Sequence, residues 1–156
     1  MTFRIHPAET PEDIAAARGL FRAYVDSLAI DLGFQDVETE LATLPGKYAP
    51  PGGAILLASD ADGRAVGCVA LRPLGSGTCE MKRLYALPRT RGTGLGRRLA
   101  EAILAEARRA GYRRILLDTL DSMAAARGLY AALGFAETAA YYANPTPGTV
   151  YLARDL

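Results

Sequence analysis

A glycine-rich basic turn is the stretch that most constrains how this chain can fold. Residues 91–98, RGTGLGRR, carry three glycines at alternate positions among three arginines and open an amphipathic helix predicted over residues 95–110. Glycine leaves backbone N–H groups uncovered, and a helix start concentrates unsatisfied donors with about half a positive charge. The stretch therefore predicts a strand–turn–helix unit that binds phosphate. The alternative is a simple turn, but that would need one glycine and no arginines.

The composition is that of one soluble globular domain. Half of the 156 residues are hydrophobic and 22% are charged, so residues 1–156 are expected to form a single domain with a proper core. The formal net charge of +1 gives no general attraction to nucleic acid or to a membrane, and neither is expected as a partner. The chain lacks a long apolar run and its first residues lack a signal-peptide core, so a cytoplasmic location is expected.

The two cysteines and the single histidine do not form a metal-binding pattern. Cys68, Cys79 and His6 lack the spacing of a zinc site, so no metal is expected. A disulfide is not expected in a reducing cytoplasm, and both cysteines are predicted to be free thiols in the core.

The first third of the chain predicts a strand and two helices. The strand is expected over residues 2–8, and a helix from Pro11 to about Leu28 follows with Thr10 as its N-cap. A weaker helix is predicted over residues 31–44. Its region is acidic, and these side chains are either solvated or line a site for a cationic substrate: Asp31, Asp36, Glu38 and Glu40.

The middle of the chain predicts an antiparallel meander followed by a crossover. Three strands are expected over residues 54–59, 65–73 and 78–87, joined by glycine-containing turns. The short apolar segment 114–119 should lie parallel to the 78–87 strand, because a helix crosses between them.

A last helix and two strands complete the predicted order of elements. The helix runs to Leu133 and is expected to be capped by Asp121 or Ser122. Strands are then predicted over residues 135–142 and 149–156.

One strand departs from the pattern of a buried strand. Within residues 80–86, EMKRLYA, three of the first four positions are ionisable, whereas a central strand covered on both faces is nearly all apolar. Buried charges need partners or a ligand, and such local departures tend to mark functional sites.

Known nucleotide-binding patterns fit the glycine turn only in part. Asp118 follows the glycines by about 20 residues, as the acidic residue of a dinucleotide-binding unit would. The spacing, however, is G-x-G-x-G rather than G-x-G-x-x-G. A P-loop is excluded because no Gly-Lys-Ser/Thr sequence follows.

The combination of motifs resembles the GNAT superfamily of N-acyltransferases. Its acyl-CoA-binding pattern, Gln/Arg-x-x-Gly-x-Gly/Ala, is matched by Arg91, Gly94 and Gly96, and its Ala-x-x-Leu-Tyr-x-x-x-Gly-Phe signature is matched over residues 126–135. The resemblance covers essentially the whole chain. One departure is Met123, where many members carry a polar residue seven positions before the tyrosine.

The resemblance implies an α/β (α+β) fold of the GNAT type. This fold has a mixed, mostly antiparallel sheet of six to seven strands, about four helices, and a central parallel strand pair that splays to form the cofactor cleft. The implied function is acetyl transfer from acetyl-CoA to a primary amine of a small molecule, by direct attack through a tetrahedral intermediate. An acyl-CoA sensor without turnover and an NAD(P)-binding protein are the alternatives, and a homodimer is implied as plausible.

The resemblance also assigns residues to the cofactor. The diphosphate of CoA would lie on the amides of the glycine turn, and the pantetheine arm would lie along the end of the preceding strand. The cofactor-binding residues expected on this basis are Leu84, Tyr85, Ala86, Arg91, Gly92, Thr93, Gly94, Leu95, Gly96 and Arg97.

Proton transfer needs an acid and a base. The resemblance implies Glu80 as the base, although a salt bridge within the sheet would explain this residue equally well, and Asp118 is an alternative carboxylate. Tyr130 matches the general acid that protonates the departing thiolate, unless it is a core tyrosine bonded to a backbone carbonyl. The acceptor pocket is expected to draw on residues that are each also explained by packing or solvation: Tyr24, Arg72, Asp118 and Tyr141.

Overall fold

A seven-stranded mixed sheet forms the centre of the protein. The computed structural model describes residues 1–156 except 29, 31 and 33–34. The strand order is β1-β2-β3-β4-β5-β7-β6, and every neighbouring pair is antiparallel except the parallel pair β4 and β5, as predicted. The strands are β1 (Arg4–Pro7), β2 (Ala54–Ser59), β3 (Ala65–Gly75), β4 (Thr78–Ala86), β5 (Arg114–Leu120), β6 (Ala136–Glu137) and β7 (Thr149–Asp155).

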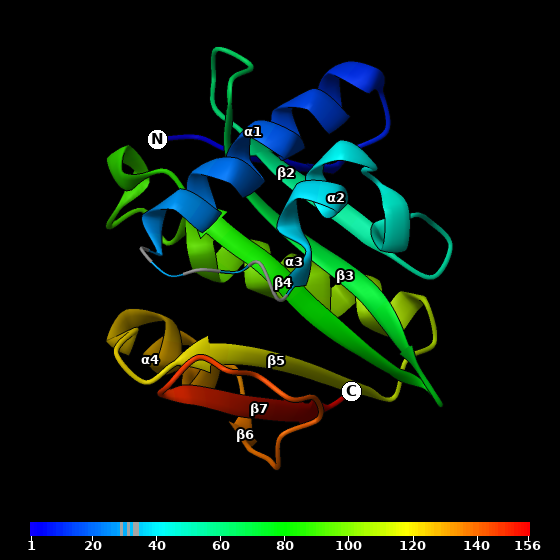
Figure 1. Cartoon of the computed structure of the whole chain (residues 1–156). Helices are drawn as coiled ribbons and strands as arrows, with labels where there is room; N and C mark the ends of the chain where they lie inside the picture. The colour runs from blue at the N-terminus through cyan, green and yellow to red at the C-terminus, as the bar shows by residue number, and fades with distance from the viewer. Residues whose placement is uncertain (29, 31, 33–34) are drawn as a thin grey trace.

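Helices cover both faces of this sheet (Figure 1). α1 and α2 pack on one face through a cluster that contains Phe21, and α3 packs on the other through a cluster that contains Leu99 and Ile103. Burying a side chain of this size stabilises the fold by about 1.5–3 kcal/mol, so the two clusters fix both layers. The helices are α1 (Pro11–Ser27), α2 (Val37–Ala42), the 3₁₀ turns η2 (Gly46–Tyr48) and η3 (Pro88–Thr90), α3 (Leu95–Arg109) and α4 (Ala124–Ala132).

Local signals place α1 as predicted but not the start of α4. Thr10 and Asp13 form a reciprocal capping box at the start of α1. The predicted caps of α4 are wrong, because Met123 occupies the N-cap and no side chain caps this helix. The Asp121 amide instead donates to the Gly148 carbonyl at 2.8 Å, which ties this turn to the approach to β7.

Two predicted elements are shorter in the structure. α2 begins at Val37 rather than at residue 31, and residue 31 itself lies outside the described residues. β6 has only two residues, and the chain leaves the strand before Tyr141. The segment between β6 and β7 is therefore free to turn back over the sheet.

The parallel strands β4 and β5 stay together for only a short distance. They pair from Thr78–Arg114 to Glu80–Leu116, and their register ends there. Beyond that point β4 continues beside β3 to Ala86, while β5 continues beside β7. The two strands thus diverge in the middle of the sheet.

A β-bulge in β4 explains the charged strand. Tyr85 pairs with Cys68 but Lys82 pairs with Ala70, so two residues of β4 face one residue of β3. Arg83 lies inside this bulge with a left-handed φ of 60°. The extra residue turns Lys82 and Arg83 to the same face of the sheet, and both donate to the amide oxygen of Gln35.

Candidate functional site

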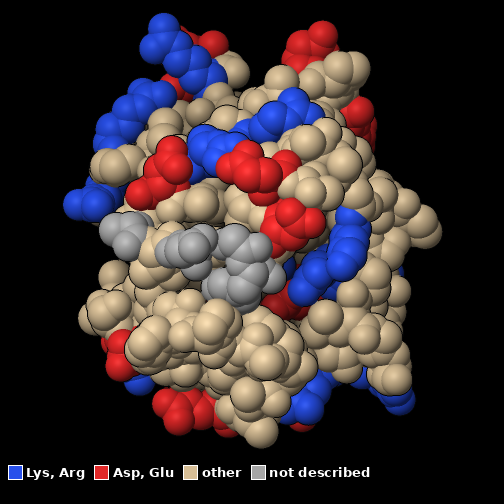
Figure 2. Space-filling view, viewed as in Figure 1, with Lys and Arg blue, Asp and Glu red and all other residues tan. Residues whose placement is uncertain are grey.

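A cleft lies where β4 and β5 diverge. Its walls come from β4 and β5, and it is closed by the region after α1, by α4 and by the segment before β7. Figure 2 shows charged side chains of both signs on the half of this face that carries α1 and α2, whereas the half over β5 and β7 is mostly uncharged. The predicted site residues that line the cleft are Tyr24, Leu84, Asp118 and Tyr130.

The start of α3 presents a row of free amides near the end of β4. Gly94 is the N-cap in a left-handed conformation (φ 77°), and no side chain caps the helix. The first backbone bond of α3 is donated by the Arg98 amide to Gly94. Within the described part of the chain, no acceptor receives a hydrogen bond from these amides: Gly92, Gly94, Leu95, Gly96 and Arg97. This arrangement suits an anion.

The glycine at position 96 also supports an anion site, because no contact within the described protein requires a glycine there. It lies in the first turn of α3, and an added Cβ would meet no described atom within 4 Å. Glycine inside a helix costs about 0.5–1 kcal/mol relative to alanine. A group that must come close to the backbone at this turn would explain the choice, so the residues fit a bound diphosphate.

Asp118 stands on the β5 wall of the cleft. It accepts a hydrogen bond from the phenol of Tyr142, which in turn receives one from the Asn144 amide at 2.8 Å. Burial, together with the bond to Asp118, raises the pKa of Tyr142 well above its ordinary value. Tyr142 therefore stays a neutral donor to Asp118.

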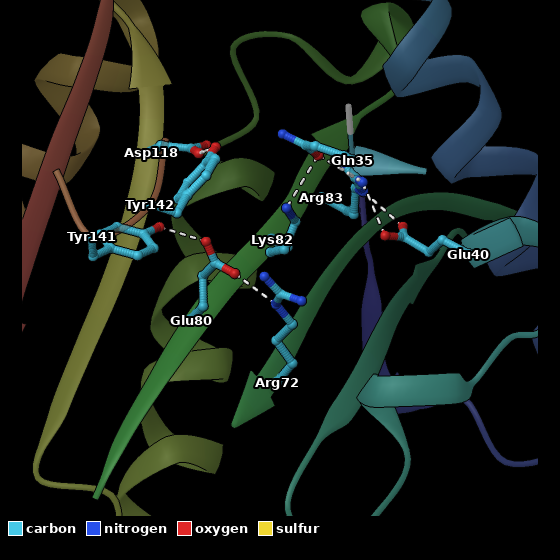
Figure 3. A network of polar contacts seen from close by, with 9 residues as sticks. All are labelled: Gln35, Glu40, Arg72, Glu80, Lys82, Arg83, Asp118, Tyr141 and Tyr142. Atoms are coloured by element: carbon cyan, nitrogen blue, oxygen red, sulfur yellow. Dashed lines mark hydrogen bonds and ion pairs between the residues drawn. The ribbon is translucent and has the colours of Figure 1, made fainter. Parts of the chain in front are cut away.

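Glu80 is buried beneath the cleft and already has two partners. It lies directly opposite Arg72 in the β3–β4 ladder, and Arg72 Nε donates to its Oε1 at 2.7 Å. Tyr141 donates to Oε2 at 2.5 Å. The Glu80 side chain is 1% exposed. The predicted salt bridge within the sheet is thus present, and Figure 3 shows Glu80 between its two donors.

A second buried ion pair neutralises Arg83. Its guanidinium donates to both carboxylate oxygens of Glu40, at 2.9 and 3.0 Å, and only 3% of the Arg83 side chain is exposed. Of the acidic residues expected near a cationic substrate, Glu40 is therefore occupied by Arg83 and Glu38 by Arg22. Asp36 lies in a second depression together with Arg72 and Tyr48, and Asp31 lies outside the described residues.

The Tyr130 hydroxyl opens into the cleft. Tyr130 is 7% exposed, and its ring packs edge-on against Phe135 at 5.7 Å. Among the described residues, no carbonyl accepts a bond from its hydroxyl, which argues against a tyrosine satisfied by the core. Burial raises the pKa of Tyr130 well above its ordinary value, so the phenol stays protonated.

The remaining predicted residues have mixed surroundings. Tyr85 packs against Tyr24 with ring centroids 5.8 Å apart, and Ala86 packs against the core cluster beneath α3. Leu95 is buried in that cluster, Thr93 donates to the Thr90 carbonyl, Arg97 pairs with Glu101, and Arg91 is exposed. At the turn, buried Leu95 can therefore offer a ligand only its backbone, whereas the side chains of Arg91 and Arg97 are exposed.

Several residues of the cleft were not assigned to the site from the sequence. Gln35 reaches Lys82 and Arg83 from a segment 47 or 48 positions away in sequence, and Thr119 and Thr146 also line the cleft. No local pattern marks these positions. The described residues hold no group of three or more metal-binding side chains, and none of their helices is both long and apolar enough to cross a bilayer.

Comparison with known proteins gives one consistent answer. Residues 15–135 match the acetyltransferase (GNAT) family. The chain is 42% identical over 153 residues to an uncharacterized N-acetyltransferase of Schizosaccharomyces pombe, which covers 97% of this chain and 94% of that protein.

Solved structures share the fold. A GNAT-family acetyltransferase of Staphylococcus aureus superposes with a TM-score of 0.81 at 18% identity, over 99% of both chains. The protein yncA of Salmonella typhimurium, solved with its cofactor acetyl-CoA, superposes with a TM-score of 0.75 at 23% identity, over 99% of this chain and 94% of that one. At these identities the likeness establishes the fold.

Removing one partner of the buried Arg83–Glu40 pair should destabilise the protein far more than removing one partner of an exposed pair. We expect Glu40→Gln to lower the free energy of unfolding by on the order of 3 kcal/mol, because it leaves the Arg83 charge buried without a counter-charge. Glu38→Gln, which removes the exposed partner of Arg22, is the matched control and should have little effect. Urea denaturation measures both variants. Equal effects would show that the Arg83 charge is not desolvated.

Proposed function

Because the chain belongs to the GNAT family of acetyltransferases, we propose that it transfers an acetyl group from acetyl-CoA to a primary amine of a small molecule. The observation that carries this proposal is the row of free amides at the start of α3, close in sequence to Leu84 on the wall of the cleft. We also propose that residues 1–156 act as one catalytic domain. A cytoplasmic location and a homodimeric state stay predictions.

Acetyl-CoA would bind along β4 and the turn that follows it. The free amides between Gly92 and Arg97 would hold the diphosphate, and exposed Arg91 would add positive charge. Beyond Glu80, the edge of β4 that faces β5 has no described strand partner, so its backbone groups are open to a pantetheine arm. The bound thioester would supply the acetyl group, and the protein would hold it in place for attack by the amine.

The protein would also handle two protons. The acceptor amine must lose a proton before it attacks, and the departing thiolate must gain one. We assign the first task to Asp118, because it lines the cleft whereas Glu80 is buried beneath it with both oxygens bonded. We assign the second task to Tyr130, whose phenol is neutral and open to the cleft.

Gly96→Glu should separate the fold from acetyl-CoA binding. A carboxylate in the first turn of a helix is favourable by roughly 0.3–1 kcal/mol, so the variant should be as stable as the parent or more so. The same carboxylate would repel the diphosphate, and we expect the Kd for acetyl-CoA to rise at least tenfold in calorimetry. Gly128→Glu, in α4 and away from the turn, is the control and should bind normally. Unchanged binding by Gly96→Glu would refute the proposed diphosphate site.

Substitutions of Asp118 and of Glu80 should have different effects on turnover. We expect Asp118→Asn to lower kcat by about 100-fold, as the loss of a general base does. Glu80→Gln should mainly destabilise the protein, by on the order of 3 kcal/mol, because it leaves Arg72 without its buried partner. Thiol release and thermal melts measure the two effects. If folded Glu80→Gln loses turnover while Asp118→Asn keeps it, Glu80 is the base.

Tyr130→Phe should slow turnover without loosening the cofactor. We expect kcat to fall by about 100-fold with little change in the Kd for acetyl-CoA, because only the proton donor is lost. The raised pKa of Tyr130 keeps the phenol protonated past pH 10, so loss of the Tyr130 proton should not lower kcat near that pH. Tyr112→Phe, which loses a bond to the Gly52 carbonyl outside the cleft, is the control. A protein that binds acetyl-CoA but releases no thiol with any amine would be a sensor instead.

A further inference from the structure

The cleft is surrounded by equal numbers of positively and negatively charged side chains, but not all of them form ion pairs. Three cations and three carboxylates meet there (Figure 3), and four of them form two ion pairs. Arg72 pairs with Glu80 at 2.7 Å, and Arg83 pairs with Glu40 at 2.9 Å. The two side chains that remain are Lys82 and Asp118.

Among the described residues, Lys82 is a cleft-lining ammonium whose hydrogen-bond acceptor is a neutral group. Its Nζ donates to the amide oxygen of Gln35 at 3.2 Å, and no described carboxylate lies within 4.0 Å of it. Burial lowers the pKa of Lys82, although the Glu80 and Asp118 carboxylates both oppose this shift. An ammonium that is partly removed from water in this way gains much from an anion.

Asp118 lies on the opposite wall of the cleft from Lys82 and also has no described ion-pair partner. It lies on β5, whereas Lys82 lies on β4, and both line the cleft between the two strands. Its only described partner is the neutral phenol of Tyr142. Within the described part of the cleft there is therefore one charged side chain of each sign without an ion-pair partner, and the two lie on opposite walls.

We propose, on the basis of the acetyltransferase function above, that the acceptor is an amine that also carries a carboxylate, such as a free amino acid. Its ammonium group would face Asp118, and its carboxylate would face Lys82 and the amide of Gln35. Such a zwitterion neutralises both unpaired charges and leaves the net charge of the cleft unchanged. An amine without a carboxylate would leave Lys82 without a direct ion pair among the described residues.

The surroundings of the bulge in β4 leave Lys82, rather than Arg83, to bind the carboxylate of the acceptor. Arg83 faces the same side of the sheet, but Glu40 occupies its guanidinium with two hydrogen bonds. Apart from Lys82, Arg83 and Asp118, the described lining of the cleft is uncharged. The cleft therefore accommodates an acceptor with one carboxylate.

The test compares amino acids with their amides as acceptors. Each amide keeps the side chain and the amine but replaces the carboxylate by a neutral group. Its ammonium group also loses a proton more easily, so a preference for the acid cannot come from a more available amine. We expect at least one amino acid to be acetylated with a kcat/KM at least tenfold above that of its amide, measured by thiol release.

Substitution of Lys82 then tests which group causes the preference. Lys82→Met should reduce the acid-to-amide ratio of kcat/KM to about 3 or less, whereas Lys82→Arg, which keeps the charge, should retain most of it. Lys47→Met removes the exposed lysine of η2 and should leave the ratio as it is. A thermal melt confirms that each variant is folded, and the acid–amide comparison in the parent protein needs no variant.

The outcomes separate this inference from the proposed function. The inference is overturned if amides are acetylated as well as the acids, if Lys82→Met lowers kcat/KM equally for both, or if only amines without a carboxylate are acetylated. In each of these cases the acetyltransferase assignment stands. If no amine of either kind leads to thiol release, the proposed function fails, and the inference fails with it.

Discussion

The early parting of β4 from β5 is the constraint on which the rest of the structure depends. Parallel strands inside a sheet normally share hydrogen bonds along their length, and unpaired backbone groups away from water are costly. Here the ladder ends at Glu80 and Leu116. Beyond that point the edge of β4 borders the cleft, so its backbone groups need water or a ligand as partners.

The polar network explains how so many charges are accommodated in the middle of a sheet. The bulge turns Lys82 and Arg83 to the face that also carries Glu80. Glu80 and Arg83 each find an oppositely charged partner on another element, β3 for the former and α2 for the latter. Satisfied pairs of this kind fix the walls of the cleft in one geometry, whereas Lys82 remains for a ligand.

At the start of α3, backbone amides are likewise left without a partner from the described part of the protein. Most helices satisfy their first amides with a capping side chain, as α1 does with Thr10 and Asp13. α3 begins instead with glycines and no cap. The resulting loss of local stability is tolerated because six of the fifteen residues of α3 are buried in the core. The open amides thus begin a helix that its apolar face holds in the core.

Most of the fold could be predicted from local signals, and most of the site could not. The cap of α1, the meander and the crossover to β5 each follow from a short pattern of residues. The bulge at Arg83 leaves no mark in the sequence, since a non-glycine residue adopts the left-handed conformation there.

The partners of the charged residues escaped prediction for a related reason. Gln35 and Tyr141 reach β4 from segments distant in sequence, and their contacts depend on how two loops fold over the sheet. The resemblance to a family pointed to Glu80 as a base, but a residue pattern does not reveal that Arg72 and Tyr141 occupy both of its oxygens. The sequence predicts where a site lies, but the contacts among its side chains could be found only in the structure.

Amide hydrogen exchange at the start of α3 tests the central claim most directly. The amides from Gly92 to Arg97 that lack protein acceptors should exchange freely in the protein alone. With saturating acetyl-CoA we expect their exchange to slow at least tenfold, together with that of the open edge of β4. If acetyl-CoA leaves these amides unprotected, or protects only amides elsewhere, the diphosphate does not bind at this turn and the account is wrong.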